Sequence, residues 1–347
     1  MTELKTQLLK NTIEDIQKTG KILADGGLVA IPTETVYGLA ADALNGKAVA
    51  EIFAAKGRPM DNPLIVHIAD FADIEKFDLV SEIPASAYKL AETFWPGPLT
   101  IIMKKGAAIP DEVSAGLSTV AIRFPSHKVA QKIISAAGTP LAAPSANLSG
   151  SPSPTTAQHV MNDMDGKIEA VLDGGACEVG LESTVITLAT DVPRVLRPGG
   201  ITVEQLREVL GEVEIDHAVT DRLEEGQQAA SPGMKYKHYA PKANVILLKC
   251  SDSEYIDYVN SNSGSGVAAL CCDEDIDFLN VKTISLGKRG DYETQAQRLF
   301  DSLRKIDDCG DVTTVFSRLP STDGVGLAVY NRLIRAAGFE VIDLEKS

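Results

Sequence analysis

Long apolar runs are missing from this sequence, and their absence excludes an ordinary membrane-spanning protein. No stretch approaches the roughly 20 consecutive apolar residues that a helix needs to cross a bilayer. Residues 1–27 alternate charged and apolar side chains at helical spacing and have no apolar core of the kind found in a secretory signal. We therefore expect a cytoplasmic protein with no membrane partner.

Cysteine is scarce, and its spacing excludes the common zinc sites. The five cysteines, at positions 177, 250, 271, 272 and 309, show no paired metal-ligand spacing. Cys271 and Cys272 are adjacent and would point to opposite faces of a strand, so a disulfide between them is not expected. We expect buried thiols, with a reactive nucleophile as the minority alternative, and no metal ion held by protein ligands.

Positive charge is also in short supply. The chain has 33 Lys and Arg against 48 Asp and Glu, a formal net charge of −15. Non-specific binding to nucleic acid requires many Lys and Arg side chains, which displace the counterions of the phosphates. We therefore expect little binding of this kind, and the composition does not exclude a small local basic patch. The sequence has no G-x-G-x-x-G loop and no evident Ser-His-Asp or Cys-His arrangement. It therefore gives no sign of a dinucleotide site or a covalent nucleophile.

The overall composition is that of an ordinary globular protein, with 44% apolar and 23% charged residues. Its 347 residues suggest two domains more readily than one. The first part mixes strands and helices without strict alternation, which predicts an α/β fold with a mixed, twisted, open sheet. From about residue 243, strands and helices alternate, which predicts a smaller, parallel, Rossmann-like sheet. We expect a first domain over 1–211, a linker over 212–242 and a C-terminal domain over 243–347.

Hydrophobic periodicity locates the individual elements. In the first domain it predicts strands at 28–32, 64–68, 99–104, 119–125 and 181–188, and helices within 3–25, 48–55, 83–94, 127–137 and 203–210. In the C-terminal domain it predicts strands at 245–249, 267–270, 283–286 and 312–316, and helices at 254–260, 292–307 and 326–337. The linker differs from both domains, because its acidic first part gives way to a basic, aromatic segment between Pro232 and Pro241.

Residues 28–68 place an unusual set of polar groups between two apolar strands. These polar residues are, in chain order, Thr33, Glu34, Thr35, Tyr37, Lys56, Arg58, Asp61 and Asn62. Prolines and glycines in the same loops restrict the course of the backbone. Hydroxyls and two cations delivered from strand ends and one helix end indicate a site for an anion and a hydroxyl-bearing ligand.

Several longer motifs occur in a fixed order along nearly the whole chain. They read PTETVYGL (32–39), KGRPMDNPLIVHI (56–68), FWPGPLT (94–100), AIRFP (121–125), APSANLSG (143–150), ESTVI (182–186) and LRPGG (196–200). In this order they resemble the YrdC-like threonylcarbamoyl-AMP synthases. SPGMKYKHYAP (231–241) and GLAVYNRLIRAA (326–337) are similar to the longer members of that family, which carry a linker and an extra C-terminal domain.

The resemblance implies an enzyme that condenses L-threonine, bicarbonate or carbon dioxide, and ATP into threonylcarbamoyl-adenylate, releasing pyrophosphate. It also implies a Mg²⁺ ion that accompanies ATP, and partner proteins that transfer the threonylcarbamoyl group to a tRNA adenosine. The residue chemistry agrees, since the reacting carbamate and triphosphate are both anionic. Fixed cations such as Lys56, Arg58, Arg123 and Arg197 would hold them together without a covalent nucleophile.

The resemblance also implies roles for individual residues. Lys56 and Arg58 correspond to catalytic positions. Threonine would be bound by Thr35, His67, Arg123, Ala143 and Ser183. ATP would be bound by Arg58, Asn62, Thr119, Ser145, Ser153, Arg197, Tyr236 and His238. Tyr37 and Asn147 would support these groups, and the linker segment 236–239 would fold over the nucleotide and exclude water.

Simpler interpretations and other functions remain open at this point. Lys56 and Arg58 would complement a helix dipole, His67 would be a core histidine bonded to backbone, and Arg123 would pair with a surface acid. A Ser-rich turn explains Ser145 equally well. The alternative function is an RNA- or tRNA-binding module without adenylate synthesis. A third is a carbamoyl-transfer domain like those of hydrogenase maturation proteins, which calls for zinc-type cysteine spacings that this chain lacks.

Overall fold

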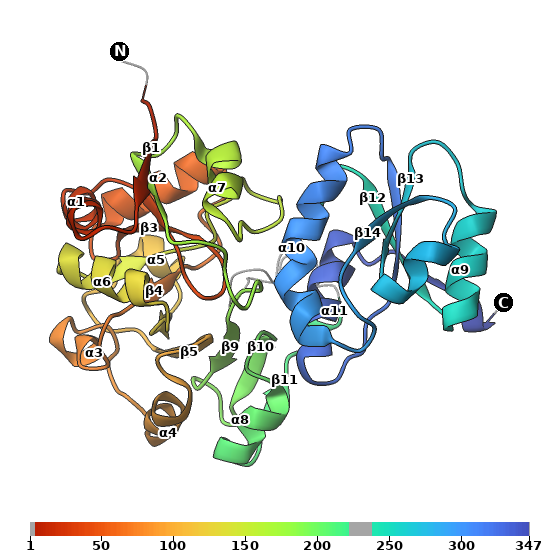
Figure 1. The fold of residues 1–347 in the computed structure, drawn as a ribbon. Coiled ribbons are helices and arrows are strands. Elements are labelled where there is room, and N and C mark those ends of the chain that lie inside the picture. Colours follow the sequence, from red (N-terminus) through yellow and green to blue (C-terminus); the bar gives the residue numbers. More distant parts are fainter. Residues whose placement is uncertain (1–3, 222–237, 347) are drawn as a thin grey trace. The chain divides into compact units, whose positions relative to one another are not determined.

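The computed structural model describes residues 4–221 and 238–346, which group into two compact units. The first unit contains residues 4–149 and 153–219, and the second contains residues 150–152, 220–221 and 238–346. Each unit is built around its own sheet (Figure 1). Two separate cores are what a chain of this length favours, because a single core stops growing at about 250–300 residues.

The first unit contains a large mixed sheet. Its strands are β1 (Gln7–Lys10), β2 (Val29–Ile31), β3 (Gly38–Asp42), β4 (Ile65–His67), β5 (Leu99–Lys104), β6 (Thr119–Arg123), β7 (Leu141–Ala142), β8 (Ala170–Asp173), β9 (Thr184–Thr187), β10 (Arg194–Arg197) and β11 (Glu214–Ile215). They lie in the order β1-β8-β2-β3-β7-β4-β6-β5-β9-β10-β11. The sheet contains both parallel pairs, such as β4–β6, and antiparallel pairs, such as β5–β6. The predicted mixed α/β sheet is therefore confirmed.

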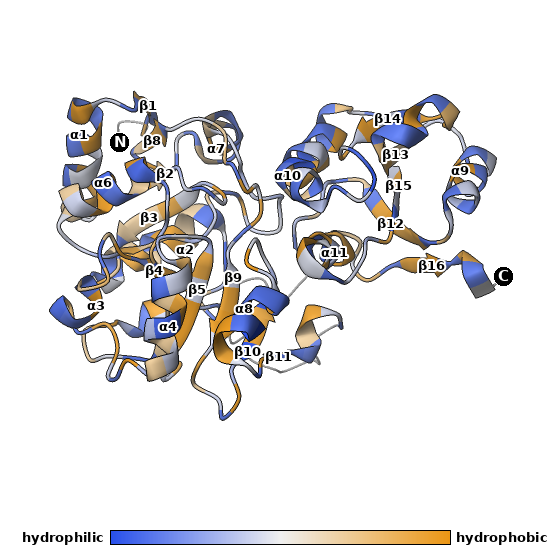
Figure 2. Ribbon diagram, turned by 60° about the horizontal axis from the view of Figure 1, so that its bottom comes forward, coloured by the Kyte–Doolittle hydropathy of each residue, from blue (hydrophilic) through white to orange (hydrophobic). Residues whose placement is uncertain are grey.

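Short helices cover this sheet. They are α1 (Ile13–Ala24), α2 (Gly46–Lys56), α3 (Asp73–Lys76), α4 (Ala85–Phe94), α5 (Asp111–Ser114), α6 (Lys128–Ala137), α7 (Ala157–Met164), α8 (Val203–Leu210) and the 3₁₀ turn η1 (His217–Val219). Figure 2 shows the central strands β5 and β9 as hydrophobic along their length, whereas α1 and α4 carry polar residues among apolar ones. That contrast is expected for a sheet buried on both faces and helices buried on one.

The N-terminal segment departs from the expected helix over residues 3–25. Gln7–Lys10 forms strand β1, which pairs in parallel with β8, and α1 begins only at Ile13. The start is fixed by Thr12, whose side chain accepts a hydrogen bond from the backbone N–H of Asp15. An N-cap of this kind satisfies a helix donor that would otherwise lack a partner. Local periodicity misses the strand because its partner lies about 160 residues away in the sequence.

Helices α1 and α6 pack together over one end of the sheet. Ile16 and Leu23 of α1 and Ile133 of α6 join strand residues such as Val29 and Leu172 in one buried cluster. Each fully buried side chain of this kind contributes about 1.5–3 kcal/mol through the removal of apolar surface from water. The predicted helix at 127–137 and the predicted strand at 28–32 therefore pack in the same hydrophobic core. This core supports the polar loop at 33–37, which directly follows the strand.

The second unit contains a wholly parallel sheet. Its strands are β12 (Asn244–Lys249), β13 (Val267–Cys271), β14 (Lys282–Ser285), β15 (Thr314–Arg318) and β16 (Val341–Asp343), in the order β14-β13-β15-β12-β16. Its helices are α9 (Asp252–Ser261), α10 (Tyr292–Asp308) and α11 (Gly324–Ala336), with the 3₁₀ turns η2 (Asp273–Phe278) and η3 (Leu344–Lys346). All pairings in it are parallel. The predicted Rossmann-like sheet is confirmed, with β16 as an added edge strand.

The cysteines only partly match the expectation of buried thiols. Cys177 and Cys271 are buried, whereas Cys250, Cys272 and Cys309 are partly exposed, and all five are free. Cys272 lies just beyond the end of β13 and caps the turn η2, so the pair at 271–272 is split between a strand and a loop. Among the described residues, none of the helices has the length and apolar character needed to cross a membrane.

Candidate active site

The loop between β2 and β3 holds the first polar group of the site. The Thr33 hydroxyl donates to the Val36 carbonyl at 2.6 Å and accepts from the backbone N–H groups of Thr35 and Val36. A side chain that replaces backbone partners in this way stabilises a tight turn. The turn places the Thr35 hydroxyl 2.9 Å from that of Thr33, fully buried. Tyr37 is also buried, and its hydroxyl donates to the carbonyl of Gly175.

Arg123, at the end of β6, is paired with Glu34 of the same loop. Its Nη2 lies 2.7 Å from Glu34 Oε1, and both side chains are at least 95% buried. Burial would raise the pKa of Glu34, but the charge of Arg123 and its hydrogen bond outweigh this effect and lower the pKa. The simpler interpretation of Arg123 as the partner of a surface acid is therefore wrong. A buried pair of this kind fixes both side chains in position.

His67 lies beside Arg123, because β4 and β6 are paired in parallel with these two residues in register. It is buried, and its Nδ1 lies 3.1 Å from the carbonyl of Ile65. This is the backbone contact expected of a core histidine. Burial and the charge of Arg123 lower the pKa of His67 to about 3. The imidazole is therefore neutral at pH 7.

Ser183 and Arg197 meet on the other side of Arg123. Thr100 of β5 is in register with Arg123, and its hydroxyl lies 2.7 Å from that of Ser183. The Arg197 guanidinium donates to the Ser183 carbonyl and hydroxyl at 3.1 and 3.2 Å. A Cβ on Gly199 would lie 2.4 Å from the Thr184 nitrogen, so the loop after β10 needs glycine to approach this closely.

Lys56 ends α2, where Gly57 takes the left-handed conformation at φ +60° and terminates the helix. Its buried ammonium donates to the carbonyls of Ser145 and Asn147. Burial, with a contribution from Arg58, lowers the pKa of Lys56. Lys56 therefore does more than complement the helix dipole, since it fixes the segment that carries two other predicted site residues.

Arg58 and Asn62 lie in the loop that follows α2. The Arg58 guanidinium donates to the Asn62 carbonyl at 3.5 Å and lies 5.9 Å from the Phe53 ring. The side-chain oxygen of Asn62 is buried and has no hydrogen-bond partner among the residues described. A buried acceptor without a partner costs about 1–3 kcal/mol unless a ligand or water fills it, which marks this loop as a place for a donor-bearing ligand.

The segment 143–155 completes the neighbourhood. Ala143 donates its backbone N–H to the Ile65 carbonyl at 3.0 Å, and Ser145 bridges to Gly38. Ser153 is fully buried, and its hydroxyl donates to Glu182 at 2.6 Å. These contacts connect motifs that are far apart in the sequence: 32–39, 143–150 and 182–186 all join at one region of the sheet.

The remaining predicted residues are Thr119, Tyr236 and His238. Thr119 begins β6, four residues before Arg123, so it lies about 13 Å away along an extended strand. Tyr236 lies outside the described residues. His238 belongs to the second unit, where its ring packs 4.4 Å from that of Tyr239, which is itself buried against Phe300 and Arg332.

Sequence reasoning gave no role to three residues of the site. Glu34 was noted only as one of the polar groups, and Thr100 and Glu182 received no assignment, yet they contact Arg123, Ser183 and Ser153. Glu34 and Glu182 lie inside quoted motifs, and Thr100 ends another. A carboxylate within a run of small and apolar residues was the available signal, because a buried charge requires a partner.

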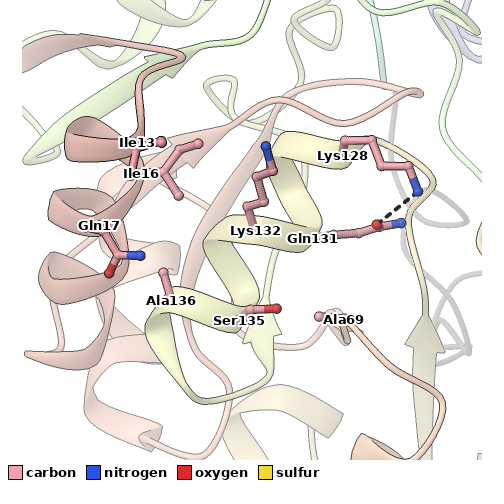
Figure 3. A pocket seen from close by; sticks show the side chains of 9 residues that line it. All are labelled: Ile13, Ile16, Gln17, Ala69, Lys128, Gln131, Lys132, Ser135 and Ala136. Carbon is pink, nitrogen blue, oxygen red and sulfur yellow. Dashed lines mark hydrogen bonds between the residues drawn. The ribbon is translucent and has the colours of Figure 1, made fainter.

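A separate groove lies at helices α1 and α6, as Figure 3 shows. It has a volume of about 750 Å³ and lies between α1 and α6, lined by residues such as Gln17, Lys128 and Lys132. Lys128 donates to Gln131 within it. None of its lining residues is a predicted site residue. The described residues also contain no group of three His, Cys, Asp or Glu side chains placed to hold a metal ion.

Comparison with known proteins gives the same picture over the whole chain. A family model described as "Telomere recombination" matches residues 21–199, and one described as "Threonylcarbamoyl-AMP synthase, C-terminal domain" matches residues 201–338. The chain is 45% identical over 341 residues to the threonylcarbamoyl-AMP synthase of Bacillus subtilis (strain 168), covering 97% of both chains. It belongs to the threonylcarbamoyl-AMP synthase family.

Other members of the family extend this similarity. The threonylcarbamoyl-AMP synthase of Pyrococcus abyssi is 44% identical over 329 residues, which cover 92% of this chain and 93% of that protein. A crystal structure of P. abyssi Sua5 complexed with L-threonine has a TM-score of 0.90 and 42% identity, and the match covers 98% and 99% of the two chains. The likeness spans both units, so it concerns the long form of this family.

Proposed function

We propose that this enzyme synthesises L-threonylcarbamoyladenylate from L-threonine, bicarbonate or carbon dioxide, and ATP, with release of pyrophosphate. The observation that carries the proposal is the joining of a buried arginine, a neutral histidine and several hydroxyls in one region of the first unit. A relative of 42% identity, similar over the whole chain, has been crystallised with L-threonine. The reaction consumes threonine's amine, bicarbonate and ATP and yields the adenylate, pyrophosphate and water.

The threonine end of the site is formed by Thr35, His67, Arg123, Ala143 and Ser183. Arg123 would pair with the substrate carboxylate, because a guanidinium matches two carboxylate oxygens. Its Nε–H is buried and lacks a hydrogen-bond partner among the described residues, so it has a donor to offer. The hydroxyls of Thr35 and Ser183 and the neutral His67 would read the hydroxyl of the substrate. A site with such fixed partners discriminates strongly against ligands that lack the matching group.

The nucleotide end contains most of the cations. Arg58, Asn62, Thr119, Ser145, Ser153, Arg197, Tyr236 and His238 would bind ATP, which enters as its Mg²⁺ complex. The carbamate oxygen attacks the α-phosphorus while pyrophosphate leaves from the opposite side, so negative charge builds up around phosphorus. Lys56 and Arg58 would stabilise that charge by fixed electrostatics. The carboxylates of Glu34 and Glu182 already face Arg123 and Ser153, which leaves the metal to the phosphate oxygens and water.

The domain roles follow from the same chemistry. We assign catalysis to residues 1–211, closure over the nucleotide to the linker 212–242, and a separate domain to 243–347. Tyr239, at the described end of that linker, is buried and takes φ +65°, a backbone conformation that costs a non-glycine residue energy. A buried Tyr239 in this conformation supports the proposal that the linker is anchored at this residue while it closes over the nucleotide. Cytoplasmic partner proteins would then transfer the threonylcarbamoyl group to tRNA.

The test is pyrophosphate release by the full-length chain. Release from ATP is expected only when threonine and bicarbonate are both present, because the carbamate is the attacking group. Omission of either substrate serves as the control. Release that does not depend on threonine would contradict the proposal. Salt-dependent retention of RNA without any turnover would support the RNA-binding alternative instead.

A further inference from the structure

Glu34 is a buried carboxylate in the threonine site with no assigned role. Its residue exposure is 3%, and its backbone is fixed by the Thr33 turn on one side and by the N–H of Val179 on the other. Oε1 lies 2.7 Å from Arg123 Nη2. The carboxylate also interacts with the backbone N–H groups of Glu34 itself and of Ser126. Because a carboxylate has about four acceptor directions, these partners leave room for one further donor.

Among the described residues around Glu34, this pair supplies the buried charges, while Glu178, which interacts with His127 and Cys177, is exposed. His67 and His127 both have pKa values lowered by burial, and burial raises the pKa of the Cys177 thiol to about 12. All three groups are therefore neutral at pH 7. A ligand that enters here meets one fixed negative and one fixed positive charge, and a buried charge is strongly destabilised unless it is paired.

An α-amino acid has the complementary pair of charges. Its ammonium nitrogen is bonded to the α-carbon and its carboxylate oxygens are two bonds from that carbon, so nitrogen and oxygen lie about 3 Å apart. This is close to the 2.7 Å between the facing atoms of Glu34 and Arg123. Arg123 also retains a buried Nε–H without a partner among the described residues, on which an entering carboxylate could be held.

We propose that Glu34 binds the α-ammonium group of threonine, so that Glu34 and Arg123 together hold the two charges of the zwitterion. The inference rests on the proposed function. It assigns a partner to the α-amine of threonine, the substrate group to which no other residue has been assigned. The side chain recognises the amine and does not remove its proton, since Arg123 keeps the carboxylate ionised and weakly basic. An acid without the amine would bring an unbalanced negative charge beside Glu34 and is rejected.

Calorimetric titration of the full-length chain with three ligands tests this role. The ligands are L-threonine, 3-hydroxybutanoate, which lacks only the α-amine, and threoninol, which keeps the ammonium but has an alcohol in place of the carboxylate. The variant is Glu34→Gln, which keeps the shape and removes the charge. Glu51→Gln, an exposed residue of α2, is the matched control, and Glu34→Asp tests whether a restored charge rescues binding.

Glu34→Gln is expected to raise the Kd of threonine and of threoninol about tenfold or more, the usual effect of losing a hydrogen bond to a charged group. It should leave the Kd of 3-hydroxybutanoate unchanged or lower it. Glu34→Asp should recover part of the threonine affinity, and Glu51→Gln should behave as wild type. Circular dichroism and thermal unfolding establish that each variant is folded.

Other results would overturn the role. Equal weakening of threonine and 3-hydroxybutanoate, with threoninol unaffected, would show that Glu34 acts only by holding Arg123. Unchanged threonine affinity in a folded Glu34→Gln protein would also exclude it. If the wild-type chain bound no threonine and released no pyrophosphate, the proposed function itself would fail. Wild-type turnover alongside either of the first two results would remove Glu34 alone.

Discussion

Buried charged side chains have different sets of partners in the two sheets. In the first unit, Arg123 at the end of β6 faces a single carboxylate, Glu34, and is surrounded by neutral groups and hydroxyls. In the second unit, Asp275 just beyond β13 is bonded by Arg318 through both of its oxygens and by Arg289 at 2.7 Å. Both arginines also contact Asp252. In the second network two arginines share two aspartates, whereas in the first a single arginine faces a single glutamate.

On the proposed function, this difference distinguishes a candidate binding site from a structural network. The crevice outside the carboxyl ends of parallel strands is where open α/β sheets bind ligands. In the second unit that crevice, lined by residues such as Cys271, Ser317 and Arg318, has a volume of only about 80 Å³, against the ~300–1,000 Å³ of typical ligand pockets. The two arginines near this crevice pair with aspartates.

The largest expected effect is a loss of kcat when an arginine of the candidate site is removed, compared with removal of an arginine on the surface. Arg58→Ala should lower kcat for pyrophosphate release by about 100-fold or more, since losing one fixed donor to a developing negative charge costs about 10²–10³ in rate. Arg194→Ala, which removes a partly exposed pair with Glu214, should leave kcat nearly unchanged. Wild-type turnover of folded Arg58→Ala would remove this residue from the mechanism.

Truncation separates the linker from the sheet that follows it. A chain that ends before Ser231 should turn over about tenfold or more slowly than one that ends after Pro241, because a misplaced or missing closing segment costs orders of magnitude in rate. Both chains lack the second sheet, so the comparison isolates the segment 231–241. Equal rates of pyrophosphate release in the two would count against closure by the linker.

In the second unit, the expected effect is on stability. Asp275→Asn should lower the free energy of unfolding of the full-length chain by about 1.5–3 kcal/mol, because it removes charge-assisted hydrogen bonds from Arg318 and Arg289 to a buried carboxylate. Asp311→Asn, at an exposed pair with Lys282, should have little effect. The Kd of threonine should be the same in both variants. Denaturant unfolding and calorimetry measure the two quantities, and a changed Kd in Asp275→Asn would break the proposed separation of roles.

The same network predicts a pH dependence. Burial would raise the pKa of Asp275, but hydrogen bonds and charge from Arg318 outweigh it and lower the pKa. A lowered carboxyl pKa stabilises the folded chain above the unfolded value of about 3.9, and this contribution is lost as the pH falls through the folded value. Asp275→Asn should therefore lose less stability than wild type on acidification below about pH 4. Parallel acid-unfolding curves would contradict this.

The smallest effect is spectroscopic and concerns the first unit. With its pKa lowered to about 3 by burial and by Arg123, His67 should stay neutral from pH 8 to 5, and its ring proton resonances should not shift. His67→Gln assigns the resonances by their loss. Since the unfolded chain takes up this proton near pH 6.5, the stabilising contribution of neutral His67 is present above that pH and declines as the pH falls toward 3. Titration near pH 6.5 in the folded chain would contradict the burial argument.

Most strands with several large apolar residues were predictable from the sequence. The runs at 99–104 and 119–125 correspond to β5 and β6, because β-branched and apolar residues stand out from their neighbours. Strand β3 was missed, since its residues GLAAD are small and give no strand signal. A Cβ on Gly38 would lie 3.1 Å from Ala143, so small residues there serve close packing between strands, which no local pattern reveals.

The sequence by itself determined the type of most elements, with β1 and β3 as exceptions, and the change from a mixed to a parallel sheet. Through its ordered motifs it also determined the family and the set of candidate residues. Tertiary structure alone decided which of those residues meet. It paired Arg123 with Glu34, brought His67 and Thr100 beside Arg123, and directed Lys56 onto carbonyls 89 and 91 positions away. The physical reason is that charge pairing and pKa depend on burial and on cross-strand register. Both arise only when distant segments pack together.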